Sequence, residues 1–122
     1  MNEADVSSKL RVALAAQGAK AMKVSDRFHA SRPDLFVCYY GRFIVIETKM
    51  HPRKPTDAQT FELTDFVQHG AQTFVATYHA CDKKLGILNM QTGHVASFTK
   101  FQEAAAWLLK PSCSSTKSVV SP

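Results

Sequence analysis

The sequence predicts an α/β fold in which a central mixed β-sheet is flanked by helices, and three observations support it. Residues 35–46 form two apolar runs separated by a Gly-containing turn, the pattern of a β-hairpin. The second run, residues 43–49, is apolar on both faces up to Glu47, as in a central strand covered on both sides. A helix at 56–70 and a further strand at 71–78 follow, an order that suggests parallel pairing.

The chain is expected to begin with a helix and a short strand. Asn2 is a plausible N-cap, Glu3 and Asp5 lie in the first turn, where the helix dipole favours acids, and Gly18 is a natural stop. Residues 19–24 form a short mixed segment that predicts a first strand. A polar, basic loop follows and ends at a proline that leads directly into an aspartate.

The hairpin determines which polar side chains meet. If its turn is centred between Tyr40 and Gly41, antiparallel pairing places Asp34 opposite Glu47, and the period-two alternation puts Lys49 on the face of Glu47. Because tyrosine is unfavourable at the first central position of a type I′ turn, a loop of three or four residues is an alternative. Four residues keep the same pairing, whereas three make it diagonal.

The second half predicts a helix, a strand, a small hairpin and a last helix. Thr56 and Gln59 form a capping-box pattern, and Thr99 with Gln102 forms another. The expected order is α-β-β-β-α-β, followed by a small C-terminal hairpin (85–90 and 94–98) and a helix. A single domain is expected over residues 1–110, with a disordered Ser-rich tail at 111–122.

Composition indicates an ordinary globular domain within the cell. The 122 residues are 45% hydrophobic and 20% charged, and no apolar run reaches membrane-spanning length. The N-terminus lacks the pattern of a signal peptide, so we expect an intracellular protein. Three cysteines, Cys38, Cys81 and Cys113, show no zinc-ligand spacing, which predicts unpaired thiols and excludes a four-cysteine cluster.

The paired carboxylates suggest a metal site. Asp34 opposite Glu47 is repulsive, so the fold needs a compensating cation. Oxygen ligands suit Mg²⁺ or Mn²⁺, and Lys49 adds a fixed positive charge where a phosphate can lie. This combination is typical of phosphodiesterases. A simple ion pair between Glu47 and Lys49 is the structural alternative.

At these residues the chain resembles the PD-(D/E)xK nucleases, and more narrowly their VRR-NUC and Holliday-junction-resolvase-like branch. The resemblance covers about residues 2–78 and rests on Pro-Asp, then Glu-x-Lys at the end of a strand, then Thr-x-x-Gln opening a helix. The matching positions are Glu3, Asp34, Glu47, Lys49 and Gln59. Ser31 stands where that branch usually has glycine. The resemblance implies a restriction-endonuclease-like core.

It also implies a metal-dependent DNA endonuclease that acts on branched or junction DNA. In that scheme Asp34, Glu47 and the backbone carbonyl of Thr48 bind Mg²⁺ or Mn²⁺, and Lys49 orients the attacking water or stabilises charge on the phosphate. Glu3 completes a second metal site, and Gln59 positions water or phosphate. From the residues alone, Glu3 is equally a first-turn acid and Gln59 a capping residue.

A net charge of +5 favours a polyanionic partner, which the resemblance narrows to DNA. Six side chains on the loops around the expected site are candidate phosphate contacts: Arg27, His29, Arg32, His51, Arg53 and Lys54. For His29, a solvated loop residue and a general base are the alternatives. The resemblance also suggests a homodimer. Two other functions are alternatives. One is a non-cleaving nucleic-acid-binding module of the same fold, and the other is a nuclease that acts on RNA or nucleotides.

Overall fold

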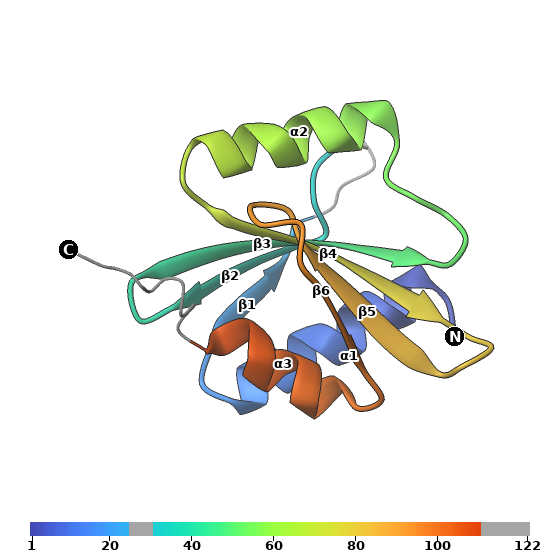
Figure 1. Cartoon of the computed structure of the whole chain (residues 1–122). Coiled ribbons are helices and arrows are strands. Elements are labelled where there is room, and N and C mark those ends of the chain that lie inside the picture. The colour runs from blue at the N-terminus through green and yellow to red at the C-terminus, as the bar shows by residue number, and fades with distance from the viewer. Residues whose placement is uncertain (25–30, 111–122) are drawn as a thin grey trace.

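The computed structural model describes residues 1–24 and 31–110, which form a six-stranded sheet between two helical layers (Figure 1). The strands lie in chain order, and all neighbours are antiparallel except β3 and β4. The elements are α1 (Glu3–Ala16), β1 (Lys20–Lys23), β2 (Leu35–Tyr39), β3 (Arg42–Met50), α2 (Asp57–Gln68), β4 (Gln72–His79), β5 (Lys84–Asn89), β6 (Val95–Phe98) and α3 (Phe101–Leu109). The predicted mixed sheet flanked by helices is confirmed.

The position of β3 explains why its sequence is apolar on both faces. The strand lies in the interior of the sheet, with β2 on one side and β4 on the other. Ile44 and Ile46 point into the larger core shared with α1 and α3, and Val45 points into a smaller core with Leu63 of α2. Figure 1 shows the same division, with α2 alone on one face of the sheet and α1 and α3 on the other.

The β2–β3 turn has two residues, as the hairpin pattern first suggested. Tyr39 pairs with Arg42, and the residues between them, Tyr40 and Gly41, have φ of 45° and 82°. Both values are positive, which is the type I′ geometry that matches the twist of the strands. The longer loops considered for this turn are therefore wrong. The Tyr40 side chain is 86% exposed, and its ring meets that of Tyr39 edge to face with centroids 4.7 Å apart.

Helix α3 does not begin with the capping box that Thr99 and Gln102 suggested. Its N-cap is Lys100, which makes no side-chain capping hydrogen bond. Four apolar residues of this short helix are buried instead, Ala104, Ala105, Leu108 and Leu109. Packing against the core therefore outweighs the local signal and sets the start of the helix one residue later.

Arg42 links the C-terminal end of α3 to the sheet through hydrogen bonds. Its guanidinium donates to the carbonyls of Leu109 (2.6 Å) and Leu108 (3.0 Å), and to the side-chain oxygen of Gln72 on β4 (2.6 and 3.0 Å). Burial lowers the pKa of Arg42, and the neighbouring Tyr39 partly offsets this. The helix carbonyls that lack intrahelical partners are thereby satisfied.

Arg42→Ala is expected to lower the free energy of unfolding by about 2–3 kcal/mol, because it leaves part-buried acceptors without a donor. Urea denaturation measures the change. Lys9→Ala, which removes an exposed cation from α1, is the control and should change stability by less than about 0.5 kcal/mol. Equal stability of the two variants would show that the Arg42 contacts contribute nothing.

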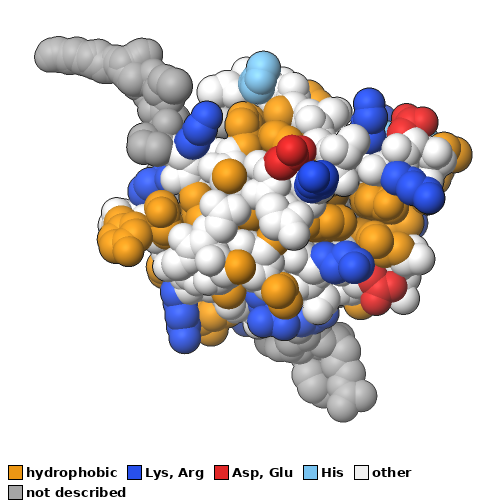
Figure 2. Space-filling view, turned by 90° about the horizontal axis from the view of Figure 1, so that it is seen from below, with side chains coloured by type: hydrophobic (Ala, Val, Ile, Leu, Met, Phe, Trp, Pro, Cys, Tyr) orange, Lys and Arg blue, Asp and Glu red, His pale blue; other side chains and the backbone are white. Residues whose placement is uncertain are grey.

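Cys38 and Cys81 are exposed free thiols, as predicted, while Cys113, Arg27, His29 and the tail at 111–122 lie outside the described residues. None of the helices in the described part is long and apolar enough to cross a membrane. Figure 2, which views the side of α1 and α3, shows Lys and Arg side chains dispersed among apolar and neutral ones, with fewer acids.

Candidate active site

The hairpin register brings Asp34 and Glu47 together. The ladder ends at the pair Leu35–Ile46, and the amide of Asp34 still donates to the carbonyl of Ile46 at 3.2 Å. One step further, Asp34 lies opposite Glu47. Because side chains alternate along a strand, Glu47 and Lys49 lie on the same face of β3 as Val45, which packs with Leu63 of α2. The predicted register of the hairpin is confirmed, whereas the catalytic and metal-binding roles of Asp34, Glu47 and Lys49 stay predictions.

The Asp34 carboxylate is held in place by β3. Its Oδ2 accepts hydrogen bonds from the backbone amide of Thr48 at 2.8 Å and from the Thr48 hydroxyl at 2.7 Å. These contacts join the start of β2 to the end of β3. They also fix the orientation of the carboxylate before any ligand arrives.

Glu47 and Lys49 form a buried pair, each 3% exposed, with Lys49 Nζ 3.5 Å from Glu47 Oε2. The other Glu47 oxygen, Oε1, is buried without a hydrogen-bond partner. The pKa of Glu47 is raised to about 7, chiefly by burial and then by the charge of Asp34; Lys49 opposes both, and Glu3 adds a smaller increase. One ammonium therefore does not compensate the acids, and Glu47 retains an oxygen that lacks a donor or a cation.

Glu3 reaches the same end of the sheet from α1. Its Oε2 accepts from the amide of Met50 at 3.4 Å and lies 3.0 Å from a guanidinium nitrogen of Arg53. In residues 1–24 and 31–110, no three His, Cys, Asp or Glu side chains are grouped closely enough to hold a metal ion. The role of Glu3 in a second metal site thus stays a prediction, while its contacts anchor the basic loop after β3.

Gln59 carries out the capping function that the pattern indicated. Thr56 is the N-cap of α2, its amide donates to Gln59 Oε1 at 2.9 Å, and its hydroxyl accepts from the Gln59 amide at 3.2 Å. The side-chain oxygen of Gln59 is therefore engaged in the capping box. Its role toward water or phosphate stays a prediction.

The basic candidates lie on two loops near the carboxylates. Arg32 immediately precedes the Pro-Asp pair, and His51, Arg53 and Lys54 follow β3; all four are exposed. The ring of His51 stacks on that of His79 with centroids 4.4 Å apart, a contact that the sequence analysis missed. The parallel pairing of Met50 with Tyr78 could have predicted this contact, because it brings the next residue of each strand, His51 and His79, side by side.

The donors present fit a hard divalent cation. Asp34 and Glu47 are carboxylates from paired strands, and the backbone carbonyl of Thr48 lies between Glu47 and Lys49 in the chain. The unpartnered Oε1 of Glu47 is the specific feature that a cation would satisfy. All three ligands are oxygens, which suits Mg²⁺ or Mn²⁺ better than zinc or copper.

Solved structures of other proteins resemble this chain, among them the following two. An archaeal Holliday junction resolvase, Hjc from Archaeoglobus fulgidus, has a TM-score of 0.60 and 19% identity, covering 87% of this chain and 99% of its own. A VRR_NUC domain has a TM-score of 0.53 and 29% identity, covering 60% of this chain and 81% of its own. No protein-family model and no curated protein sequence matches the chain. The chain therefore has a restriction-endonuclease-like fold, and these structural neighbours support the VRR-NUC and Holliday-junction-resolvase-like nuclease branch that the motif indicated.

Proposed function

We propose that this protein is a Mg²⁺- or Mn²⁺-dependent DNA endonuclease that hydrolyses phosphodiester bonds in branched or junction DNA. One observation carries the proposal. The hairpin register places Asp34 opposite Glu47, Lys49 Nζ lies 3.5 Å from Glu47 Oε2, and the buried Oε1 of Glu47 has no hydrogen-bond partner. The names of the structural neighbours, a junction resolvase and a VRR_NUC domain, support the same class of reaction and substrate.

Each residue has a distinct role in this proposal. Asp34, Glu47 and the Thr48 carbonyl hold the cation, with Asp34 oriented in advance by Thr48. When bound, the cation lowers the pKa of a water molecule so that it can attack phosphorus at neutral pH. Lys49 positions this water or offsets the charge that develops on the phosphate oxygens. Glu3 serves a second cation site, and Gln59 assists with water or phosphate.

Binding of DNA is assigned to the basic loops. Arg32, His51, Arg53 and Lys54 are exposed near the carboxylates, and Arg27 and His29 precede Arg32 in the chain. Cations in this position contact backbone phosphates and set the register of the substrate without reading its sequence. Because one small domain covers little of a branched substrate, we include a homodimer that makes two cuts in the proposal.

The decisive experiment incubates the purified protein with end-labelled single-stranded, duplex, flapped and four-way DNA. Each substrate is tested with Mg²⁺, with Mn²⁺ and with chelator, and an RNA copy of the single strand is included. The proposal expects cleavage of branched DNA in the presence of either cation and none with chelator. Cleavage of RNA alone, or of no substrate under any condition, would overturn it.

The alternative is a non-cleaving DNA-binding module, and one observation favours it. Lys49 already lies 3.5 Å from Glu47, so the pair has a structural explanation as a buried ion pair. A thermal shift separates the two functions, because a cation that binds only the folded chain raises the melting temperature by mass action.

At a Mg²⁺ concentration ten times its dissociation constant, we expect the melting temperature to rise by about 5 °C, which corresponds to about 1.4 kcal/mol. Asp34→Asn should abolish this rise, because it keeps an acceptor for Thr48 but removes a ligand charge. Asp57→Asn, in the first turn of α2, is the matched control and should respond like the wild type. An identical rise in all three proteins would place the cation elsewhere.

A further inference from the structure

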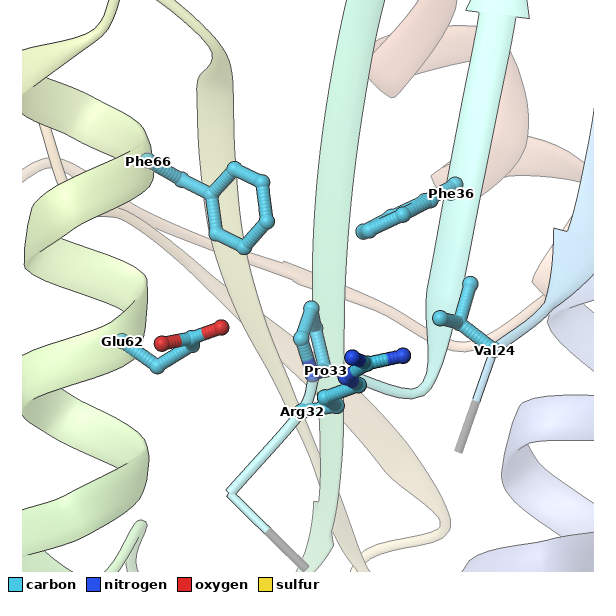
Figure 3. A pocket seen from close by; sticks show the side chains of 6 residues that line it. All are labelled: Val24, Arg32, Pro33, Phe36, Glu62 and Phe66. Atoms are coloured by element: carbon cyan, nitrogen blue, oxygen red, sulfur yellow. The ribbon is translucent and has the colours of Figure 1, made fainter. Parts of the chain in front are cut away.

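A small pocket lies next to the Pro-Asp pair, between α2 and the start of β2. It has a volume of about 220 Å³ and is lined by Val24, Arg32, Pro33, Phe36, Glu62 and Phe66 (Figure 3). Pro33 directly precedes Asp34. Phe36, on β2, lies two residues beyond Asp34, which is about 7 Å along a strand. The pocket therefore adjoins the place proposed for the phosphate that is cut.

One side of the pocket is aromatic and apolar. The rings of Phe36 and Phe66 meet edge to face, with centroids 5.5 Å apart and an interplanar angle of 70°. Pro33 and Val24 add further apolar lining to the pocket. Flat apolar surfaces of this kind favour stacking of another planar ring.

The other side of the pocket carries two charged groups of opposite sign. Figure 3 shows the Glu62 carboxylate extending from α2 toward Pro33 and Arg32. Neither the Glu62 carboxylate nor the Arg32 guanidinium makes a hydrogen bond or ion pair with another residue in the described part of the chain. The pocket thus combines a stacking wall with an uncommitted acceptor and an uncommitted cation.

We propose that this pocket receives one unpaired nucleobase of the strand whose phosphate lies at Asp34, Glu47 and Lys49. This inference rests on the proposed function and specifies its substrate. At about 220 Å³ the pocket is smaller than a typical drug-sized site, of about 300–1,000 Å³, and suits a single ring system. The base stacks on the Phe36 and Phe66 wall, and Glu62 accepts from its exocyclic amino group. Arg32 contacts the flanking phosphate.

A base in an intact duplex is paired and stacked, so it reaches such a pocket only after extrusion from the helix. A base at a flap, bulge or junction is already unpaired and does not incur this cost. The protein should therefore prefer substrates with an unpaired nucleotide next to the cut. Cytosine or adenine should bind better than thymine, which has no exocyclic amino group.

The test measures binding to a fluorescent flapped DNA in the presence of chelator, so that no cleavage occurs. An abasic nucleotide replaces each unpaired position in turn. Loss of the base should weaken binding about ten-fold at one position, as expected for one stacked base, and change it by less than two-fold at the others. Glu62→Gln should remove the preference for cytosine over thymine at that position. Glu103→Gln, which makes the same change on α3, should retain it.

The abasic scan uses the wild-type protein and does not depend on any variant folding. A scan in which no position changes affinity by more than two-fold would overturn the base pocket, even if the protein cuts branched DNA as proposed. Conversely, a protein that cuts no DNA but shows the single sensitive position would keep the pocket and lose the nuclease. A cytosine preference that is unchanged in Glu62→Gln contradicts the role of Glu62.

Discussion

Replacing Lys49 is expected to reduce DNA cleavage by a factor of about 100 to 1,000 or more, the effect of removing one group that stabilises transition-state charge. The ammonium lies 3.5 Å from Glu47 and is 3% exposed, so no other cation takes its place easily. Lys49→Ala leaves a cavity, and Lys49→Met fills it with a neutral chain of similar size. Both variants should lose cleavage, and the methionine variant should be the more stable.

The fold should survive this change because Glu47 can take up a proton. Without Lys49 the pKa of Glu47 rises above about 7, the value it already reaches through burial and Asp34. Circular dichroism and the affinity for DNA in chelator are the controls, and DNA affinity should change by about two-fold at most. Lys84→Ala, at the exposed start of β5, should cut at the wild-type rate. A Lys49→Met protein that also cuts at that rate would refute the catalytic assignment.

The central part of the site could be predicted because it depends on local rules. A two-residue turn sets the register of a hairpin, which places Asp34 opposite Glu47, and strand alternation then puts Lys49 on the face of Glu47. No knowledge of distant packing is needed for either step. The capping box of Thr56 and Gln59 is equally local, since both residues lie within the first turn of α2.

The remaining contacts depend on how separate elements pack, which the sequence does not express. Glu3 meets Arg53 because α1 begins beside the loop after β3, and the two residues are distant in the chain. Phe66 and Glu62 meet Pro33 only once α2 has settled on its face of the sheet. Arg42 was part of the turn pattern, but its bonds to Leu108 and Leu109 depend on the final position of α3.

The difference between local patterns and long-range packing also explains why the capping pattern before α3 gave a wrong prediction. Thr99 and Gln102 satisfy a capping pattern, yet Lys100 is the N-cap. A capping box is worth about 1 kcal/mol, whereas burying four apolar side chains contributes several times as much. Where the two conflict, the position of the helix follows the core.

The stability of the metal-free protein is expected to fall as pH rises through neutrality, because of Glu47. The pKa of this carboxyl rises from its ordinary value of 4.5 to about 7 in the folded chain. Between these values the folded protein binds a proton that the unfolded chain does not, so raising the pH favours unfolding. At about 1.4 kcal/mol per pH unit, the loss between pH 4.5 and pH 7 is on the order of 3 kcal/mol. Glu47 is 3% exposed, so solvent screening reduces this little.

Glu47→Gln removes this titration and keeps the size of the side chain. Urea denaturation in chelator should therefore show that the free energy of unfolding of the wild type falls between pH 5 and pH 8. That of the variant should stay closer to its own value at pH 5. Glu103→Gln, on the exposed side of α3, should reproduce the wild-type slope. Parallel pH profiles for the wild type and Glu47→Gln would contradict the assignment. Since a cation binds the ionised carboxylate, Mg²⁺ should flatten the wild-type profile and leave that of Glu47→Gln unchanged.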